Sequence, residues 1–247
     1  YDRDTGFNQG AVTLTYRDYT LTQDRGRTFQ LDAMDVDETN FVANAGAVMG
    51  EFQRTQVIPE VDAYRYSKIA ALAKGASHET ATFTPSKANI LGQLDADIAN
   101  IRDVVGEDEP LVIIMSTPVR TIMNTADGIT RFLDTTQFKA GVVDTKVKTY
   151  NETPIFGVPS LRMKTAYVFK DGTTSGQEAG GFVADGTAKG INWIIIARRA
   201  PIAISKTDKV RIFEPNVNQK ADAWKLDYRK YHDIWIPNNK LAGVWVN

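Results

Sequence analysis

The sequence of 247 residues has no cysteine and only two histidines, His78 and His232. These absences exclude disulfide bridges, thiolate nucleophiles and cysteine-based zinc sites. The chain also lacks an apolar run near the roughly 18 residues that a membrane-spanning helix needs, and it has no charged-then-apolar signal segment. We therefore expect a soluble protein that has no membrane partner.

Neither sign of charge predominates, since 29 basic residues balance 30 acidic ones and the formal net charge is −1. This balance argues against a protein that binds nucleic acid through a basic face, although not against one that merely encloses nucleic acid. Hydrophobic residues make up 43% of the chain and charged residues 24%, values typical of a globular protein with a real core. The length allows one large domain or two medium ones.

The most informative stretch is residues 35–74, which predict one long helix. Asp35 and Glu38 have the layout of a capping box. Apolar residues then recur at helical spacing, namely Phe41, Ala45, Val48, Phe52, Val61, Tyr66, Ile69 and Ala73. At about 1.5 Å per residue the helix would span roughly 55 Å, which exceeds the width of a compact domain of this size. Pro59 removes a backbone donor, so we expect either a kink between Thr55 and Pro59 or two shorter helices.

The first part of the chain, residues 1–32, predicts an extended ribbon. Apolar and polar residues alternate over residues 12–17, which is typical of a strand with one buried face. A turn is predicted at residues 24–26 and a short strand at residues 28–31. A two-stranded ribbon is only marginally stable by itself, so we expect it to lean on another surface, which could belong to another subunit.

The middle of the chain, residues 76–205, combines helical and strand patterns. Thr84 predicts the N-cap of a helix that has proline at its first position. The apolar stripe of this helix comprises Ile90, Leu91, Leu94, Ile98, Ile101 and Val105. A buried strand at residues 111–115 and a second helix from Thr117 complete an α/β layer. Residues 171–190 are rich in glycine and polar side chains and predict a surface loop.

The remainder of the chain is rich in strand patterns. Strands are predicted at residues 192–197, 201–205, 210–213, 223–236 and 241–246. Because these strands follow the α/β layer, we expect the C-terminal ones to pack back on the long helix. One domain would then be built from both ends of the chain.

Candidate reactive groups are few. Strand alternation places His232 on the opposite face from Asp233, so the pair is poorly placed as a catalytic dyad, and we expect a hydrogen-bonded structural histidine. A metal-assisted hydrolase remains an alternative because three acidic clusters occur, at Asp35/Asp37/Glu38, at Asp95/Asp97 and at Glu107/Asp108/Glu109. Their spacing fits helix capping and solvated helix positions better than a calcium loop. The basic and aromatic stretch 225–230 keeps a nucleic-acid-binding module open, although cross-strand ion pairs explain it better. We predict no catalytic, cofactor or metal site.

Several motifs resemble one known family. The matching stretches are DRGRTFQLD (24–32), VIPEVDAYRY (57–66), VPSLRM (158–163), ADAW (221–224), YRKYHD (228–233) and NKLAG (239–243). In their order and spacing they are similar to the major capsid proteins of tailed bacteriophages, which have the Hong Kong 97-type fold. The resemblance covers nearly the whole chain, and the C-terminal stretches carry most of it.

The resemblance implies an α+β protein with three parts. Residues 1–34 would form part of the E-loop, a β-ribbon. Residues 35–75 and 206–247 would form the P-domain, with a long spine helix and β-strands, and residues 76–205 would form the α/β A-domain. The family also has an N-terminal arm, for which we find no counterpart here, so we expect this chain to be a monomer or a loose oligomer.

The resemblance also implies a function. Copies of the chain would form pentamers and hexamers that close into an icosahedral shell around double-stranded DNA, without sequence-specific binding. Scaffolding, portal and decoration proteins would be further partners, and the protein would reside in the virion after assembly in the host cytoplasm. Tyr16, Tyr19, Arg25 and Arg27 are predicted to contact neighbouring subunits, because tyrosine and arginine are enriched at interfaces. The alternative is the shell of an encapsulin-like cellular nanocompartment.

Overall fold

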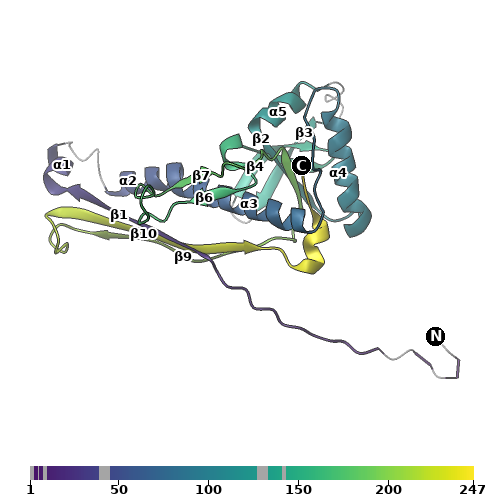
Figure 1. The fold of residues 1–247 in the computed structure, drawn as a ribbon, viewed down its shortest axis with the longest axis horizontal. Helices are drawn as coiled ribbons and strands as arrows, with labels where there is room; N and C mark the ends of the chain where they lie inside the picture. Colours follow the sequence, from purple (N-terminus) through teal and green to yellow (C-terminus); the bar gives the residue numbers. More distant parts are fainter. Residues whose placement is uncertain (1–2, 5, 8–9, 39–44, 127–132, 141–142) are drawn as a thin grey trace.

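The computed structural model describes residues 3–4, 6–7, 10–38, 45–126, 133–140 and 143–247. Figure 1 shows an elongated molecule with a thick end, where helices cover a sheet, and a thin part made of a long helix lying along a three-stranded sheet. The first residues extend away from both parts. None of the helices described is both long enough and apolar enough to cross a membrane.

The thick end is built on a six-stranded sheet. Its strand order is β11-β8-β2-β5-β4-β3, and β2 and β5 are parallel while the other pairs are antiparallel. The strands are β2 (Leu111–Ser116), β3 (Leu133–Ala140), β4 (Val143–Tyr150), β5 (Thr153–Val158), β8 (Trp193–Ala197) and β11 (Val244–Val246). Helices α4 (Ile90–Val105) and α5 (Thr117–Asn124) accompany this sheet, as the α/β pattern predicted.

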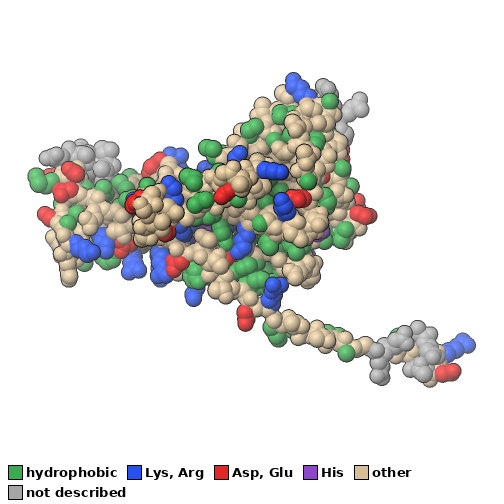
Figure 2. Space-filling model, in the orientation of Figure 1, with side chains coloured by type: hydrophobic (Ala, Val, Ile, Leu, Met, Phe, Trp, Pro, Cys, Tyr) green, Lys and Arg blue, Asp and Glu red, His purple; other side chains and the backbone are tan. Residues whose placement is uncertain are grey.

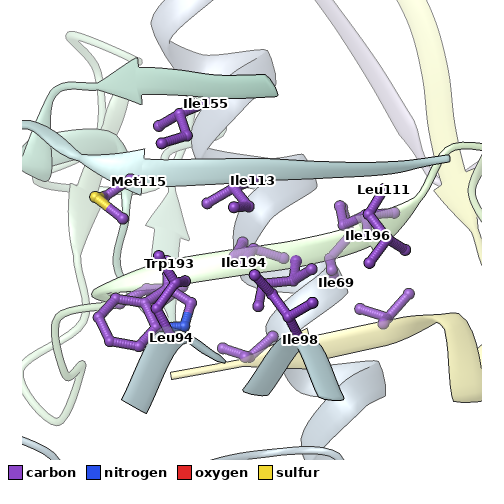
Figure 3. Close-up of a cluster of buried hydrophobic side chains, with 14 of the residues drawn as sticks. Ile69, Leu94, Ile98, Leu111, Ile113, Met115, Ile155, Trp193, Ile194 and Ile196 are labelled. Carbon is purple, nitrogen blue, oxygen red and sulfur yellow. The ribbon is translucent and has the colours of Figure 1, made fainter. Parts of the chain in front are cut away.

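The main core lies between this sheet, α4 and the end of the long helix. In Figure 3, Leu94 of α4 lies beside Trp193 of β8, and both belong to this buried cluster. The predicted stripe of α4 is confirmed at its four fully or nearly buried members, Ile90, Leu94, Ile98 and Ile101. Its predicted start at Thr84 is wrong. The Asn89 side chain accepts from Ser86 N and donates to the Thr84 carbonyl, which holds this segment in a turn before the helix begins.

The thin part contains the second sheet, in the order β1-β10-β9. Its strands are β1 (Gln23–Asp32), β9 (Ile202–Phe213) and β10 (Ala223–Trp235), and both pairs are antiparallel. The predicted turn at residues 24–26 is wrong, because β1 pairs with β10 along its whole length. Gly26 fits there since a Cβ atom would lie 3.0 Å from the Tyr228 carbonyl oxygen. The two strands predicted within 201–213 are one strand, β9.

The long helix runs without interruption from Ala45 to Gly75, so the alternative of two separate helices is wrong. It comprises α2 (Ala45–Phe52), a π-helical turn (Gln53–Val57) and α3 (Ile58–Gly75). The predicted distortion near Pro59 takes the form of this π turn. Pro59 cannot donate to the residue four positions earlier, and Ile58 N donates instead to the Gln53 carbonyl, five positions back.

Before the long helix comes the short helix α1 (Ala33–Glu38), and the predicted positions 39–44 lie outside the described residues. The capping box predicted at Asp35 is wrong, because the helix begins earlier. Asp32, the last residue of β1, accepts a hydrogen bond from Met34 N at 2.9 Å and so caps α1.

A second, smaller core joins the long helix to the thin sheet. Met49, Leu226 and Tyr228 are buried there. The Phe52 ring lies edge-on to Phe29 at 4.8 Å and to Tyr228 at 5.9 Å between ring centroids. The helix therefore covers β1 and β10 and leaves β9 largely exposed.

Two further features complete the fold. The predicted loop 171–190 contains strand β7 (Phe182–Ala184), which pairs with β6 (Tyr167–Phe169), and Phe169 packs edge-on against Tyr64 of α3 at 5.7 Å. Short 3₁₀ helices occupy Ser160–Arg162 and Asn238–Gly243. Residues after Lys206 are divided between the two sheets, because the last strand, β11, pairs with β8 rather than with β10.

Candidate assembly surface

Two of the four predicted contact residues lie in an extended segment that stands away from the body. Residues 10–22 form no helix or strand, and Figure 2 shows the segment projecting into solvent. Val12, Leu14 and Tyr16 are 90%, 71% and 88% exposed. Tyr19 is nearer the body and packs on Trp235, with ring centroids 5.3 Å apart. The alternating apolar side chains expected from the sequence are therefore present, but they pack on nothing in the described chain.

The base of this segment is anchored by a buried carboxylate. Asp233 is fully buried and accepts hydrogen bonds from Thr22 N (3.1 Å), Thr22 Oγ1 (2.8 Å) and Tyr64 OH (2.8 Å), while Lys68 forms an ion pair with it. Burial alone would raise the pKa of Asp233, but the hydrogen bonds from Lys68, Tyr64 and Thr22 outweigh it and hold that pKa below its usual value. No sequence pattern indicated this network, because Thr22, Tyr64, Lys68 and Asp233 lie far apart in the chain.

Arg25 and Arg27, the other two predicted contact residues, make contacts within their own chain. Arg25 donates two hydrogen bonds to Glu60 of α3, Nε–Oε1 at 2.7 Å and Nη2–Oε2 at 3.2 Å. It also donates a hydrogen bond to the Gly181 carbonyl oxygen. Arg27 Nη1 lies 3.4 Å from the Ala179 carbonyl oxygen. Both side chains therefore connect β1 to the segment between β6 and β7. Their contact with a neighbouring subunit stays a prediction.

A cavity of about 590 Å³ lies where these elements meet. It is bounded by β1, β10, the π turn with the start of α3, and the segment between β6 and β7, and its walls include Phe29, Phe52, Val57, Gly181 and His232. The π turn contributes Gln56 and Val57, so the space lies beside the distorted stretch of the helix.

His232 lines this cavity and differs from the expected hydrogen-bonded histidine. Its side chain is 3% exposed and lies edge-on to Tyr64, but its Nδ1 has no hydrogen-bond partner among the described residues. Burial, reinforced by the positive charges of Arg65 and Lys230, lowers the pKa of His232 from 6.5 to about 4. The imidazole is therefore neutral at physiological pH.

Members of two of the acidic clusters considered for a metal-assisted hydrolase make hydrogen bonds or ion pairs within the fold. Asp97 was expected to be solvated, but it is fully buried and accepts hydrogen bonds from four neutral side chains, those of Thr80, Gln93, Trp193 and Asn247. Asp95 accepts from Tyr150 OH at 2.8 Å. Glu107 pairs with Arg102 at 2.8 Å. Within the described ranges, no three His, Cys, Asp or Glu side chains are grouped to hold a metal ion.

The basic stretch 225–230 lies on β10, and cross-strand ion pairs explain it as predicted. Arg229 bonds Asp24 on β1, with Nε–Oδ1 at 2.9 Å, and Lys230 bonds Asp208 on β9 at 2.7 Å. Figure 2 shows Lys and Arg side chains along the lower margin of the thin part, where β9 and β10 run in Figure 1. Carboxylates neutralise Lys225, Arg229 and Lys230, which favours the structural explanation of this stretch over a nucleic-acid-binding one.

Strand β9 was missed as a candidate surface. It has β10 on one side, and its other edge pairs with no described residue. Val210 and Ile212 are 40% and 47% exposed although their cross-strand partners, Tyr228 and Leu226, are buried under the long helix. The alternation of Val210 and Ile212 with Lys209 and Arg211 predicted a strand, but nothing in it revealed that the strand lies at an edge.

The fold of this chain is also found in solved structures of other proteins. No family model and no curated protein matches the sequence. Solved structures match it over most of its length. The capsid of cyanophage P-SCSP1u superposes with a TM-score of 0.57 at 10% identity, covering 98% of this chain and 79% of that chain.

Two further structures are similar to a comparable degree. The mature capsid of bacteriophage PhiM1 has a TM-score of 0.52 at 12% identity, covering 98% of this chain and 78% of the other. A virus-like particle from Pyrococcus furiosus has a TM-score of 0.53 at 9% identity, covering 94% and 79%. At such identities the likeness shows the fold. The chain therefore has the α+β Hong Kong 97-type fold of phage capsid proteins, which confirms the predicted fold class.

Proposed function

We propose that this protein is the structural subunit of an icosahedral phage capsid, in which pentamers and hexamers of the chain enclose double-stranded DNA. The observation that carries the proposal is the exposed segment 10–18, whose apolar side chains have no partner surface among the described residues. Val12, Leu14 and Tyr16 are exposed in the described chain, and contact with a neighbouring copy would bury them. The elongated body and its open sheet edge support the same conclusion, since both suit one copy in a larger assembly.

The parts of the fold then take the following roles. Residues 1–34, with the extended segment and β1, act as the E-loop. The long helix with β10 and most of β9 acts as the P-domain, for which the proposed ranges are 35–75 and 206–247. Residues 76–205 contribute most of the A-domain, to which β11 adds an edge strand from the other end of the chain. Tyr16 and Tyr19 are the proposed contacts of the E-loop with a neighbouring subunit.

The role is structural and not enzymatic. Three of the candidate acidic residues, Asp95, Asp97 and Glu107, serve as hydrogen-bond acceptors or ion-pair partners within the fold, which supports this view. Other copies of the chain are the principal partners, and scaffolding, portal and decoration proteins are further ones. The protein would be assembled in the host cytoplasm and reside in the virion.

Electron microscopy and analytical ultracentrifugation of the protein produced from its complete gene test this function. We expect capsomer rings or closed shells at high protein concentration. A protein that stays monomeric under all these conditions would contradict the proposal. A panel of generic esters and phosphodiesters, with and without divalent metal ions, tests the alternative of a hydrolase, for which turnover would be required.

A cellular nanocompartment shell is the second candidate, because the chain is also similar in structure to a virus-like particle from the cellular organism Pyrococcus furiosus. The content of purified particles separates the two functions. Packaged double-stranded DNA supports the capsid, whereas a protein cargo with little nucleic acid supports the compartment.

A further inference from the structure

The cavity beside the thin sheet has the size of a small-molecule site. Its volume of about 590 Å³ falls within the roughly 300–1,000 Å³ that is typical of such sites. Segments far apart in the chain enclose it, namely β1, the π turn with the start of α3, the segment between β6 and β7, and β10. Single π turns within α-helices occur often at functional sites, and Gln56 and Val57 of the π turn both line this cavity.

Part of the lining is apolar. Phe29 of β1, Phe52 of the long helix and Tyr228 of β10 meet there edge to face. Val57 and Val61 of the long helix add aliphatic surface. Aromatic and aliphatic side chains of this kind hold the apolar body of a ligand.

The three carboxylates of the lining, those of Asp24, Glu60 and Asp171, already have partners within the chain. Glu60 is paired with Arg25, and Asp24 is paired with Arg229. Asp171 accepts hydrogen bonds from two backbone nitrogens of its own loop, each at 2.8 Å. The lining therefore presents little negative charge that is not already compensated.

Two cations of the lining are not neutralised by an ion pair. Arg27 donates only a hydrogen bond of 3.4 Å, to the Ala179 carbonyl oxygen. The Lys170 ammonium makes neither a hydrogen bond nor an ion pair with a described residue. Glu178, which interacts with the charge of Lys170, accepts a hydrogen bond from Gly176 N at 3.0 Å instead. The unpaired charge of the lining is therefore positive.

His232 is a second, independent indication of a ligand. Its ring lines the cavity, and its Nδ1 atom is buried without a hydrogen-bond partner among the described residues. Such a buried nitrogen is rare in folded proteins and calls for a partner that the fold itself does not supply. A hydrogen-bonding group bound beside the ring would be such a partner.

We infer that this cavity binds a small organic anion with an apolar body, of which an aromatic carboxylate is the simplest example. The apolar body packs against the rings of Phe29, Phe52 and Tyr228, and the anionic group is attracted by Lys170 and Arg27. A neutral molecule of the same shape lacks this attraction, and a cation is repelled by the two unpaired charges.

Binding at this place has a consequence for the fold. The ligand contacts β1, β10 and the long helix together, and a ligand that binds only the folded chain stabilises it by mass action. The inference goes beyond the proposed function and does not rest on it, because every wall of the cavity belongs to one chain.

Calorimetric titration of the protein produced from its complete gene tests the inference. The probes are naphthoate, an aromatic carboxylate, and naphthalenemethanol, which has the same aromatic body without the charge. We expect saturable binding of naphthoate and about fivefold weaker binding of the alcohol, the factor that a partly exposed charge contact contributes. Equal affinities would overturn the assignment of an anion, and the absence of binding at millimolar naphthoate would overturn the site.

The two histidines locate the bound probe. With isotope-labelled histidine, nuclear magnetic resonance should show that naphthoate shifts the imidazole signals of His232. The signals of His78 should stay unchanged, because that ring is bonded to the Leu241 carbonyl oxygen and does not line the cavity. Binding that leaves the His232 signals unchanged would contradict the inference.

Two pairs of variants test the lining itself. Lys170→Gln removes a lining cation and should weaken naphthoate binding about fivefold, whereas Lys189→Gln removes an exposed lysine outside the lining and should not. Gln56→Trp places an indole at the cavity and should weaken the binding of both probes. Thr55→Trp, at the adjacent exposed position outside the lining, should leave both affinities unchanged. Circular dichroism checks that all four variants fold, and equal affinities within either pair would overturn the inference.

Discussion

The two sheets of this protein differ in how completely they are buried. The six-stranded sheet is covered on its core side by α4 and the end of the long helix, and every residue of its strand β8 is buried. The three-stranded sheet is covered only over β1 and β10, and nearly every residue of β9 is exposed. The central strands β2 and β8 of the first sheet are buried within one chain, whereas β9 of the second sheet is exposed along most of its length. We therefore expect stability and association to depend on different parts of the molecule.

This division predicts that substitutions in the six-stranded sheet act on folding and that those on β9 act on association. Trp193→Ala, which removes a fully buried indole and its hydrogen bond to Asp97, should lower the free energy of unfolding by about 3–5 kcal/mol. Chemical denaturation measured by fluorescence and circular dichroism checks this value. Val210→Ala is the matched truncation on β9 and should change stability by less than about 0.5 kcal/mol. Equal losses of unfolding free energy in both variants would contradict the proposed difference between the two sheets.

The cavity beside the thin sheet predicts a pH dependence. In the unfolded chain His232 titrates near 6.5, whereas in the fold its pKa is about 4. Between these values the unfolded state binds more protons, so stability should fall as the pH drops from 6.5 towards 4 and should be constant above this window. The loss should reach about 2 kcal/mol, because the adjacent cavity screens part of the charge.

Denaturation at a series of pH values checks this dependence in the wild-type protein and in His232→Gln. The variant lacks the titrating group and should show a flatter profile between pH 4 and 6.5. A variant that retains the full slope would assign the pH dependence to other groups.

A smaller effect is expected at the ion pair between β1 and α3. Arg25 and Glu60 are mostly buried and joined by two hydrogen bonds, so Arg25→Ala should lower the free energy of unfolding by about 1 kcal/mol. Arg25→Lys retains the charge but not the paired geometry and should recover only part of this loss. Thermal unfolding of both variants measures the difference. A fully restored stability in Arg25→Lys would show that charge alone matters there.

The smallest effect is expected on the solvent face of the thin sheet. Asp24 and Arg229 form a well-aligned pair, but both side chains are largely exposed to water. Asp24→Asn should therefore leave the midpoint of thermal unfolding unchanged. A measurable shift would mean either that a neighbouring molecule buries this face or that the pair stabilises the isolated chain. Repeating the measurement below the concentration at which the protein associates distinguishes these two explanations.

Local patterns predicted those features that depend on neighbouring residues. The spacing of Leu94, Ile98 and Ile101 predicted α4 and its buried face, and Pro59 predicted the distortion of the long helix. The resemblance of short motifs predicted the fold class. Patterns failed where distant residues decide the outcome. Residues 24–26 have the composition of a turn, but pairing with β10 holds them in a strand. Asp97 has the spacing of an exposed helix position, but the partners that bury it lie up to 150 residues away.

The candidate surface divides in the same way. The sequence by itself determined which segments alternate between apolar and polar residues, because a strand repeats every two residues wherever it lies. Only the tertiary structure decided that β10 is the central strand and β9 an edge strand of the thin sheet. It also decided that residues 10–18 are exposed and that Thr22 is hydrogen-bonded to Asp233, 211 positions later in the chain. Strand order and edges depend on contacts between distant parts of the chain, and no local pattern records them.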